Sequence, residues 1–475
     1  MSFTLFRPVR SRGARTLRAL VVVLAVGVAG ALGYGAYVFS RLAPIGSAYA
    51  AKVLCSGVFV SGRAAEAVIR EDILEDTHPL MRFVQPSVDM SRHVTSATFF
   101  GMARREAAYR PGLGCTIAIG LPAAELAQSP GPDMPPAADD DLPLAAPGPG
   151  VDGGKLNAAL DWAFSEPDPD KRRRTRAVVV MHEGSVIAQR YAPGFSADTP
   201  MQGWSMTKCV TGALVGVLVQ DGMLAIDGDA LLPEWRAPGD TRAQITLDQL
   251  LRMTSGLQFQ ESYSGPIEDV LEMLFATADA ASFAAAKPLD APPGTRWQYS
   301  SGTTNILSRL IRDALGGSEQ DYLAFPRRAL FDRIGMRHAV IESDASGGLV
   351  GSSFMYATPY DWARFGQLLL QDGSWKDQRI LPQGWVRYMA TLTPLSTRKN
   401  FGAHLWVKVP PPYNSVAPNP PALPSDAYHA VGYEGQFVSV IPSRNLVVVR
   451  LGLSRRDHSW DQEVFLSRLL EAFPG

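Results

Sequence analysis

The sequence predicts an α+β protein in which an antiparallel sheet is flanked by helices and carries a helical insertion. Segments with the alternating pattern of strands lie near both ends of the region 151–475, and most helix-like segments lie between them. Strands from both ends of a chain suit one shared sheet, with the intervening helices packed over it. An uncharged N-terminal stretch adds one transmembrane helix, followed by a small strand-rich module.

The N-terminus predicts a membrane anchor. Residues 1–18 contain five arginines and no acidic residue, and residues 19–39 are uncharged and dominated by Ala, Val, Leu and Gly. About 20 such residues span a bilayer as a helix, and the preceding arginines favour a cytoplasmic N-terminus. We therefore expect a single pass through the inner membrane, with the bulk of the chain on the periplasmic side. A cleaved signal peptide is the alternative, because Ala48-Tyr49-Ala50 resembles a cleavage site, although it lies well beyond the apolar run.

A small module at residues 52–120 and a linker at residues 121–150 are expected next. The module should contain one short helix, Ala64–Ile73, and strands at Cys55–Val60, Val94–Phe100, Glu106–Tyr109 and Cys115–Ile119. A periplasmic location permits disulfides, and Cys55 and Cys115 both lie at predicted strand edges, so we expect them to pair. Cys209 lies in an apolar helix, where a free thiol is expected. The linker is rich in Pro, Ala and Gly and predicts an extended segment.

The main domain, residues 151–475, should begin with a helix, Leu156–Phe164, and a β-hairpin formed by Ala177–Met181 and Val186–Arg190. The expected helices of its middle part, besides the one described next, are Leu247–Gly256, Ile267–Ala278, Thr304–Leu315 and Tyr360–Leu370. A proline-rich loop at 410–424 precedes a second hairpin, Gly435–Ile441 with Leu446–Leu453, and a terminal helix, Asp461–Phe473.

The stretch Gly203–Gly222 is the strongest candidate for a catalytic element. It opens with Ser205-Met206-Thr207-Lys208, an S-x-x-K tetrapeptide, and continues with apolar residues at helical spacing. Ser205 and Lys208 should therefore share one face of the first helical turn. A lysine whose pKa is lowered by burial can take the proton of a serine hydroxyl, and a helix N-terminus favours a developing oxyanion. A second match, Ser396-Thr397-Arg398-Lys399, has no apolar helix behind it, and we interpret it as a loop.

Two further segments supply the partners that a serine nucleophile needs. Tyr299 follows a proline-glycine turn and precedes a helix, so it can project from a loop as a proton carrier, although a tyrosine in isolation is more often a core residue. A backbone N–H on a strand that faces the helix start would complete an oxyanion hole. The stretch His429–Gln436 enters a predicted strand, and Gly432 and Gly435 would let the backbone approach closely.

Taken together, these motifs resemble those of the serine β-lactamase and penicillin-binding-protein superfamily, in the same order along the chain. The matching segments are Ser205–Lys208, Tyr299-Ser300-Ser301 and Ala430-Val431-Gly432. The ending GYEGQFVSVIPSRNLVVVRLG is similar to that of 6-aminohexanoate-dimer hydrolases and family esterases. The resemblance covers about residues 153–475 and implies a β-lactamase-like fold. It also implies that Ser205 is the nucleophile, Lys208 the general base and Tyr299 the proton carrier. By the same resemblance, the N–H groups of Ser205 and Tyr433 form the oxyanion hole.

Two positions depart from the motifs of β-lactamases. Ser301 stands where the second motif often has asparagine, and Ala430 stands where a lysine serves the carboxylate of the substrate. Glu434 adds a negative charge nearby. We therefore expect the substrate-binding residues, which are Ser301, Ala430, Gly432 and Glu434, to favour a small neutral ester or amide over an anionic β-lactam. His429 either assists or is structural.

Composition argues against several other classes of protein. The net charge is −1 and no basic tract lies beyond the N-terminus and residues 171–174, so a nucleic-acid partner is not expected. No C-x-x-C or H-E-x-x-H motif occurs, and we expect neither a metal nor a cofactor. The oligomeric state does not follow from the sequence. The sequence thus predicts a membrane-anchored serine hydrolase. The alternatives are a β-lactamase or penicillin-binding-type D-Ala peptidase, and a catalytically quiet binding protein on the same fold.

Overall fold

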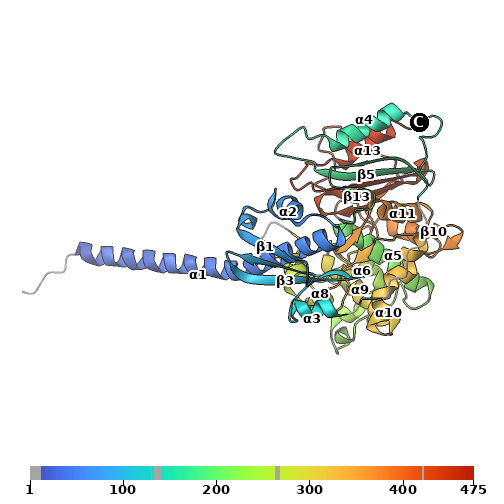
Figure 1. Ribbon diagram of the computed structural model, residues 1–475. Coiled ribbons are helices and arrows are strands. Elements are labelled where there is room, and N and C mark those ends of the chain that lie inside the picture. Colours follow the sequence, from blue (N-terminus) through green and yellow to red (C-terminus); the bar gives the residue numbers. More distant parts are fainter. Residues whose placement is uncertain are drawn as a thin grey trace, which may run out of the picture.

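The computed structural model describes residues 12–129, 131–132, 142–229, 231–262, 268–419 and 422–474 (Figure 1). One long helix extends away from the body of the molecule, which consists of a small sheet beside that helix and a larger part with sheet and helices. The larger part has the predicted α+β architecture, an antiparallel sheet with flanking and inserted helices.

The extended helix is α1, Arg12–Cys55, and it is much longer than the predicted apolar span. The large apolar side chains between Leu20 and Val28 are all exposed, whereas Ala48 and Ala50 are buried against the body. Residues Ala19–Val60 are long and apolar enough to cross a membrane by length and composition. The helix therefore has an apolar half outside the body and a half that belongs to the core of the fold.

The strand predicted at Cys55–Val60 is wrong. Helix α1 ends at Cys55 and the chain continues as a π-helical turn, Ser56–Val60. This turn packs tightly against its neighbours, since a Cβ on Gly57 would lie 2.7 Å from a methyl carbon of Val68. The β-branched residues of the segment suggested a strand, but the preceding helix and its tertiary contacts outweigh that preference. The predicted short helix at 64–73 is present as α2, Ala65–Val68, and a π-helical segment, Ile69–Leu74.

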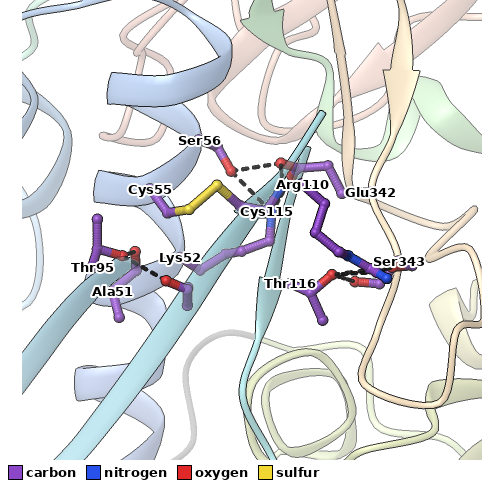
Figure 2. The surroundings of a disulfide bond; sticks show 11 residues. Ala51, Lys52, Cys55, Ser56, Thr95, Arg110, Cys115, Thr116, Glu342 and Ser343 are labelled. Carbon is purple, nitrogen blue, oxygen red and sulfur yellow. Dashed lines mark hydrogen bonds and ion pairs between the residues drawn. A yellow bond between two sulfur atoms is a disulfide. The ribbon is translucent and has the colours of Figure 1, made fainter. Parts of the chain in front are cut away.

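A four-stranded antiparallel sheet packs against α1. Its strands, in spatial order, are β1 (Val84–Asp89), β2 (Val94–Phe99), β3 (Met102–Arg110) and β4 (Gly114–Ile117). The last three were predicted, and β1 was not. A disulfide joins Cys55 at the end of α1 to Cys115 on β4 (Figure 2), as expected from the sequence, with the two Cα atoms 6.0 Å apart. Cys209 is a buried free thiol.

A buried ion pair docks this small sheet onto the larger part of the molecule. The carboxylate of Glu342 pairs with Lys52 of α1, and it also accepts hydrogen bonds from Ser56 Oγ at 2.8 Å and from the N–H of Cys115 at 2.7 Å (Figure 2). A buried carboxylate without partners would be strongly destabilising, so this contact requires the two parts to meet in one arrangement.

The predicted linker is only partly extended. Residues Ala123–Gln128 form a short helix, α3, and Leu144 pairs with Val186 at the edge of the larger sheet. Residue 130 and residues 133–141 lie outside the described residues.

The larger sheet joins strands from both ends of the main domain, as predicted. Its strand order is β12-β13-β14-β5-β6, and every neighbouring pair is antiparallel. The strands are β5 (Thr175–His182), β6 (Ser185–Tyr191), β12 (Tyr428–Gly432), β13 (Gln436–Ile441) and β14 (Leu446–Gly452). The C-terminal strand β14 lies beside β5, with Val449 opposite Val179. Both hairpins are therefore present, and they are joined through the two strands most distant in sequence.

Helices cover both faces of this sheet. Helices α4 (Gly153–Phe164) and α13 (Gln462–Leu470) lie on one face, and α11 (Pro359–Leu370) lies on the other (Figure 1). Helix α11 starts after Thr358, whose side chain and that of Asp361 form a capping box around Pro359 at the first turn. Because both faces are covered, the strands read as nearly continuous apolar runs, and β13 and β14 are buried along their whole length.

The helical insertion lies on the α11 side of the sheet. Its helices are α5 (Thr207–Gln220), α6 (Leu247–Leu251), α7 (Asp269–Ala276), α8 (Ala280–Ala285), α9 (Ser301–Leu315), α10 (Glu319–Pro326) and α12 (Trp385–Ala390). Short strands accompany them: β7 (Met201–Gln202), β8 (Val340–Ile341), β9 (Met355–Ala357), β10 (Ser374–Trp375) and β11 (Gln378–Arg379). Helix α6 is shorter than predicted because Met253 adopts a left-handed φ of 61° and ends the helical path before Gly256.

Candidate active site

Ser205 lies at the junction between a short strand and a buried helix. Strand β7 leads into a 3-10 turn, Trp204–Met206, and α5 follows directly. Trp204 has a φ of 47°, a left-handed conformation that is strained for a residue with a large side chain. Gly203 precedes it, and a Cβ at that position would lie 2.3 Å from the ring of Trp362. The nucleophile candidate is therefore presented by a strained and closely packed turn.

The side-chain amine of Lys208 lies 3.0 Å from Ser205 Oγ, which is the proximity that the S-x-x-K spacing predicts. The same amine lies 2.9 Å from Ser301 Oγ and 3.0 Å from the carbonyl oxygen of Ser352. Lys208 is 2% exposed, and burial lowers its pKa to about 8, although the nearby carboxylate of Glu261 opposes this shift. A neutral amine is therefore accessible near physiological pH, and a neutral amine can accept the proton of Ser205.

Glu261 is a member of this site that sequence reasoning missed. One carboxylate oxygen of Glu261 lies 2.5 Å from Ser301 Oγ, and the other accepts the N–H of Ser301 at 2.6 Å. Burial raises the pKa of Glu261, and the charge of Lys208 opposes that change. No spacing rule links Glu261 to Ser205 or Lys208. The only sequence signal is that Glu261 is the one charged residue between Met253 and Gly265.

Tyr299 contacts both Lys208 and Ser205. Its ring centroid is 4.9 Å from the Lys208 amine, and the rings of Phe401 and Trp406 pack against it at 5.8 and 5.4 Å. Burial and the charge of Glu261 raise the pKa of Tyr299 well above its usual value, whereas a hydrogen bond with Ser205 opposes the shift. The phenol is therefore protonated and in contact with the nucleophile, as a proton carrier must be.

Helix α9 explains why Tyr299 occupies this position. The helix starts after Ser300, whose hydroxyl accepts the N–H of Thr303 at 3.1 Å and so caps the first turn. Ser301 is the first residue of the helix, and its side chain is buried against Lys208. The helix start therefore presents Tyr299 and Ser301 together, and both meet Lys208.

The end of β12 approaches the turn that carries Ser205. A Cβ on Gly432 would lie 2.1 Å from the carbonyl oxygen of Gly203, so only glycine fits at this crossing. Tyr433 follows, 39% exposed, with its ring 5.9 Å from that of Trp204 in an edge-to-face arrangement. The backbone of Tyr433 is thus brought beside the start of α5, where the sequence predicted the second oxyanion donor.

Comparison with known proteins agrees with this geometry. The family model named Beta-lactamase matches residues 158–464 of the chain. The chain belongs to the beta-lactamase family of serine hydrolases. The matched region includes every residue of the site described above and begins after the small N-terminal sheet and its linker.

Curated relatives in this family match part of the chain. A 6-aminohexanoate-dimer hydrolase of Paenarthrobacter ureafaciens is 26% identical in an alignment 235 positions long that covers 46% of this chain and 59% of that protein. A protein of Mycobacterium tuberculosis is 31% identical in an alignment 263 positions long that covers 44% of this chain and 64% of that protein. The match thus spans about three-fifths of the length of these relatives.

Solved structures of the family share the fold. A family VIII carboxylesterase has a TM-score of 0.52 at 17% sequence identity, with 69% of this chain and 98% of that chain covered. A class C beta-lactamase has a TM-score of 0.51 at 17% identity, with 69% of this chain and 99% of that chain covered. The resemblance stated from the sequence motifs is therefore confirmed at the level of family and fold.

Two of the predicted substrate-binding residues have other surroundings in the structure. Ser301, at the asparagine position of the family's second motif, is buried and bridges Lys208 and Glu261, so its hydroxyl is engaged by the protein itself. Ala430, at the lysine position of the third motif, is 1% exposed and packs into the core on the helical side of the sheet. The structure therefore shows no cation at position 430 that could receive a substrate carboxylate.

The expectation that Glu434 adds an uncompensated negative charge beside the substrate is wrong. Glu434 is 4% exposed, and its carboxylate accepts hydrogen bonds from Arg455 Nε at 2.6 Å and from Trp204 Nε1 at 3.2 Å. The ion pair with Arg455 neutralises the charge. The sequence did not suggest this because Arg455 lies 21 positions later, beyond the next two strands.

The remaining polar candidates lie outside the reacting groups. His429 is buried and contacts Ser439 at 2.8 Å, and burial lowers its pKa to about 3, so we assign it a structural role. Ser396 and Lys399 of the second S-x-x-K match lie in a segment without helix or strand, as predicted, and Ser396 bonds to Asn400 at 3.2 Å. Among the described residues, no group of three or more His, Cys, Asp or Glu is arranged to hold a metal ion.

Proposed function

We propose that this protein is a membrane-anchored serine hydrolase that cleaves a small neutral ester or amide through an acyl-serine intermediate. The observation that carries this proposal is the distance of 3.0 Å between Ser205 Oγ and the amine of Lys208, whose pKa is lowered by burial to about 8. A serine hydroxyl becomes a competent nucleophile when an adjacent base takes its proton.

The reaction follows from the positions of these groups. Lys208 accepts the proton of Ser205 as Oγ attacks the carbonyl carbon of the substrate. The N–H groups of Ser205 and Tyr433 stabilise the negative charge on the carbonyl oxygen of the tetrahedral intermediate. Tyr299 donates its proton to the leaving alcohol or amine and regains one from Lys208. Water then attacks the acyl-serine by the same sequence of proton transfers, which releases the acid and restores Ser205.

The surroundings of the site favour a neutral acyl group. Phe401 and Trp406 form an aromatic wall beside Tyr299. The cation that would bind a carboxylate in a β-lactamase or a D-Ala peptidase is replaced by the buried Ala430. The relative from Paenarthrobacter ureafaciens is named for the hydrolysis of an amide dimer, which supports amides beside esters as the substrate class.

Membrane anchoring is part of the proposal, and the buried half of α1 supports it. Ala48-Tyr49-Ala50, the cleavage-like sequence, lies inside α1, and both alanines are fully buried in the body. Cleavage after Ala50 would remove core residues of α1 that precede the cut, such as Ala43 and Ile45, from the folded body. An uncleaved α1 with its N-terminus in the cytoplasm would place the hydrolase on the periplasmic side of the inner membrane.

Labelling of the full-length protein with a fluorophosphonate probe tests the proposed activity. We expect wild-type protein to be labelled and Ser205→Ala to be unlabelled. Turnover of p-nitrophenyl butyrate should fall by several orders of magnitude in Ser205→Ala and Lys208→Ala, since such groups act as a unit. Tyr299→Phe, which keeps the ring and removes the proton, should lose ~10²–10⁴ in kcat. Normal turnover by Ser205→Ala would overturn the proposal, and an unlabelled, inactive wild-type protein would favour a binding protein on the same fold.

A further inference from the structure

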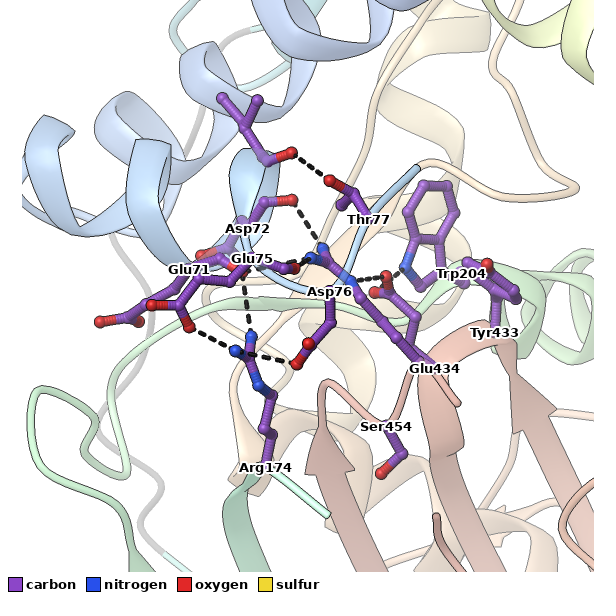
Figure 3. A network of polar contacts seen from close by, with 12 residues as sticks. Glu71, Asp72, Glu75, Asp76, Thr77, Arg174, Trp204, Tyr433, Glu434 and Ser454 are labelled. Atoms are coloured by element: carbon purple, nitrogen blue, oxygen red, sulfur yellow. Dashed lines mark hydrogen bonds and ion pairs between the residues drawn. The ribbon is translucent and has the colours of Figure 1, made fainter. Parts of the chain in front are cut away.

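The two residues that neighbour the proposed oxyanion donors are hydrogen-bonded to each other. Trp204 directly precedes Ser205 and Glu434 directly follows Tyr433, and Trp204 Nε1 donates to Glu434 Oε2 at 3.2 Å (Figure 3). Both residues have left-handed backbones, with φ of 47° and 62°. Such conformations are disfavoured for residues other than glycine and persist where the surroundings impose them. This side-chain contact therefore joins the two strained segments that carry the donors.

Arg455 connects this pair to the N-terminal part of the chain. Its Nε donates to the other carboxylate oxygen of Glu434 at 2.6 Å, and both side chains are 5% exposed. The remaining nitrogens of the guanidinium donate to backbone carbonyls of the π-helical segment Ile69–Leu74 and the residue after it. These bonds are Nη2 to Asp72 O at 2.6 Å, Nη1 to Glu75 O at 2.5 Å and Nη1 to Glu71 O at 3.2 Å.

Other ion pairs hold that segment against the main sheet. The carboxylate of Asp72 accepts hydrogen bonds from Arg63 and from Arg176, and Arg176 donates two of them, at 2.7 and 2.9 Å. Burial alone would raise the pKa of Asp72, but Arg176 and Arg63 outweigh burial and bring it to about 2. Arg174 pairs with Glu75 and Asp76 (Figure 3). The segment that Arg455 binds is thus fixed at the start of β5, an interior strand of the larger sheet, by Arg176 on that strand and by Arg174 just before it.

We propose that Glu434 and Arg455 are positioning residues through which the N-terminal module sets the geometry of the oxyanion hole. Carbonyl groups of the module fix the guanidinium of Arg455, and Arg455 fixes the carboxylate of Glu434. Glu434 follows Tyr433 in the chain and is hydrogen-bonded to Trp204, which precedes Ser205. Glu434 thereby fixes the positions of both donor N–H groups relative to each other. The beta-lactamase family match begins at residue 158, so the part of this device at residues 71–75 is an addition outside the matched region. The inference rests on the proposed function, because it acts on the same oxyanion.

Glu434→Gln and Trp204→Phe in the full-length protein test the inference. The first variant turns the carboxylate into an amide. The amide oxygen can still accept from Arg455, whereas the amide nitrogen cannot accept from Trp204 Nε1. The second removes only the indole donor. An oxyanion donor is worth about 10²–10³ in kcat, and displacement should forfeit part of that, so we expect kcat for p-nitrophenyl butyrate to fall ~10–100-fold with KM within about twofold. Affinity for an alkyl boronic acid, which forms a tetrahedral adduct with Ser205, should fall in parallel with kcat.

Arg455→Lys and Arg110→Lys separate positioning from general stability. A lysine at 455 keeps the charge but cannot bind Glu434 and three carbonyls together, so kcat and boronate affinity should fall as for Glu434→Gln. Arg110 binds Thr116 and Ser343 elsewhere between the module and the main domain, without contact to Glu434. Arg110→Lys should lower the melting temperature without changing kcat.

The outcomes distinguish this inference from the proposed function. If Trp204→Phe folds and keeps wild-type kcat and wild-type boronate affinity, the inference is overturned. Labelling of Ser205 by the fluorophosphonate would still support the proposed hydrolase function in that case. Equal loss of kcat in Arg110→Lys also overturns it, since docking alone would then explain the effect. If Glu434→Gln does not fold, Trp204→Phe decides. If the wild-type protein neither reacts with the fluorophosphonate nor turns over ester, the proposed function fails, and the inference fails with it.

Discussion

Gly432 lies so close to Gly203 that a Cβ added at 432 would be 2.1 Å from the Gly203 carbonyl oxygen. Gly432 itself has an ordinary extended backbone, with φ of −121°. The requirement for glycine at this position is therefore one of space between two backbones. This crossing brings the end of β12 to the turn that presents Ser205.

Gly432→Ala should separate these two backbones. The added methyl meets a backbone atom, which cannot rotate away, so we expect a loss of ~1–3 kcal/mol in the free energy of unfolding. Displacement of Tyr433 should also lower kcat for p-nitrophenyl butyrate by at least ~10-fold, as expected for a disturbed oxyanion donor. Gly153→Ala is the matched control, because a Cβ there meets no atom within 4 Å, and its kcat should be unchanged. Wild-type kcat in Gly432→Ala would contradict the assignment of this crossing to the site.

The pH dependence of the reaction should report Lys208. Burial lowers the pKa of Lys208 to about 8, and the neutral amine is the reactive form, so kcat/KM should rise about tenfold per pH unit below pH 8 and level off above it. The charge of Glu261 raises the pKa of Lys208. Glu261→Gln should therefore move the midpoint to lower pH. Glu272→Gln, which changes a carboxylate paired with Arg41, should leave the midpoint where it is. A midpoint that moves to higher pH in Glu261→Gln would contradict the proposed role of Lys208 as base.

Buried histidines should make the fold sensitive to acid. Burial lowers the pKa of His404 to about 4 and that of His429 to about 3, whereas an unfolded histidine titrates near 6.5. The unfolded chain therefore binds these protons first. Stability is full above about pH 6.5 and is lost as pH falls toward the folded pKa values, by about 1.4 kcal/mol per pH unit for each histidine. Urea titrations between pH 6 and 4.5 give the free energy of unfolding at each pH. His429→Gln should reduce the dependence of that free energy on pH by about 1.4 kcal/mol per pH unit, which corresponds to one proton. An unchanged slope would contradict the assignment of a neutral buried His429.

The sequence predicted the elements whose pattern is local and missed contacts between distant positions. The hairpins at 177–190 and 436–452 follow from apolar runs around turn residues, and both are present. The segment Cys55–Val60 has strand-like composition, but it continues a helix that packs on a sheet, so composition gave the wrong element. Ser205 and Lys208 were predictable because one helical turn joins them. Glu261 and Arg455 were not, because only the fold brings them to Lys208 and Glu434.

The third motif, Ala430-Val431-Gly432, should make the protein prefer neutral esters over β-lactams. A β-lactam must dock its carboxylate, and in this chain the lysine position of the motif is the buried Ala430, with valine beside it in place of a hydroxyl residue. Two missing charge-assisted hydrogen bonds, at ~1.5–3 kcal/mol each, disfavour an anionic substrate by ~10²–10⁴ in kcat/KM, since about 1.4 kcal/mol is tenfold. Glu434 contributes no repulsion, because Arg455 neutralises it.

The measurement that checks this preference is kcat/KM for nitrocefin against p-nitrophenyl butyrate on the same preparation of full-length protein. An activated neutral ester needs only the acylation groups Ser205, Lys208 and Tyr299, so it should be the better substrate by ~10²–10⁴. Methyl esterification of a β-lactam carboxylate removes the charge that the site does not receive, and should bring its rate of Ser205 acylation closer to that of the ester. Because Ala430 is buried in the core, the test relies on changing the substrate rather than on placing a lysine at 430. If nitrocefin proves the better substrate, the carboxylate has another receptor in the site, and the protein is a β-lactamase.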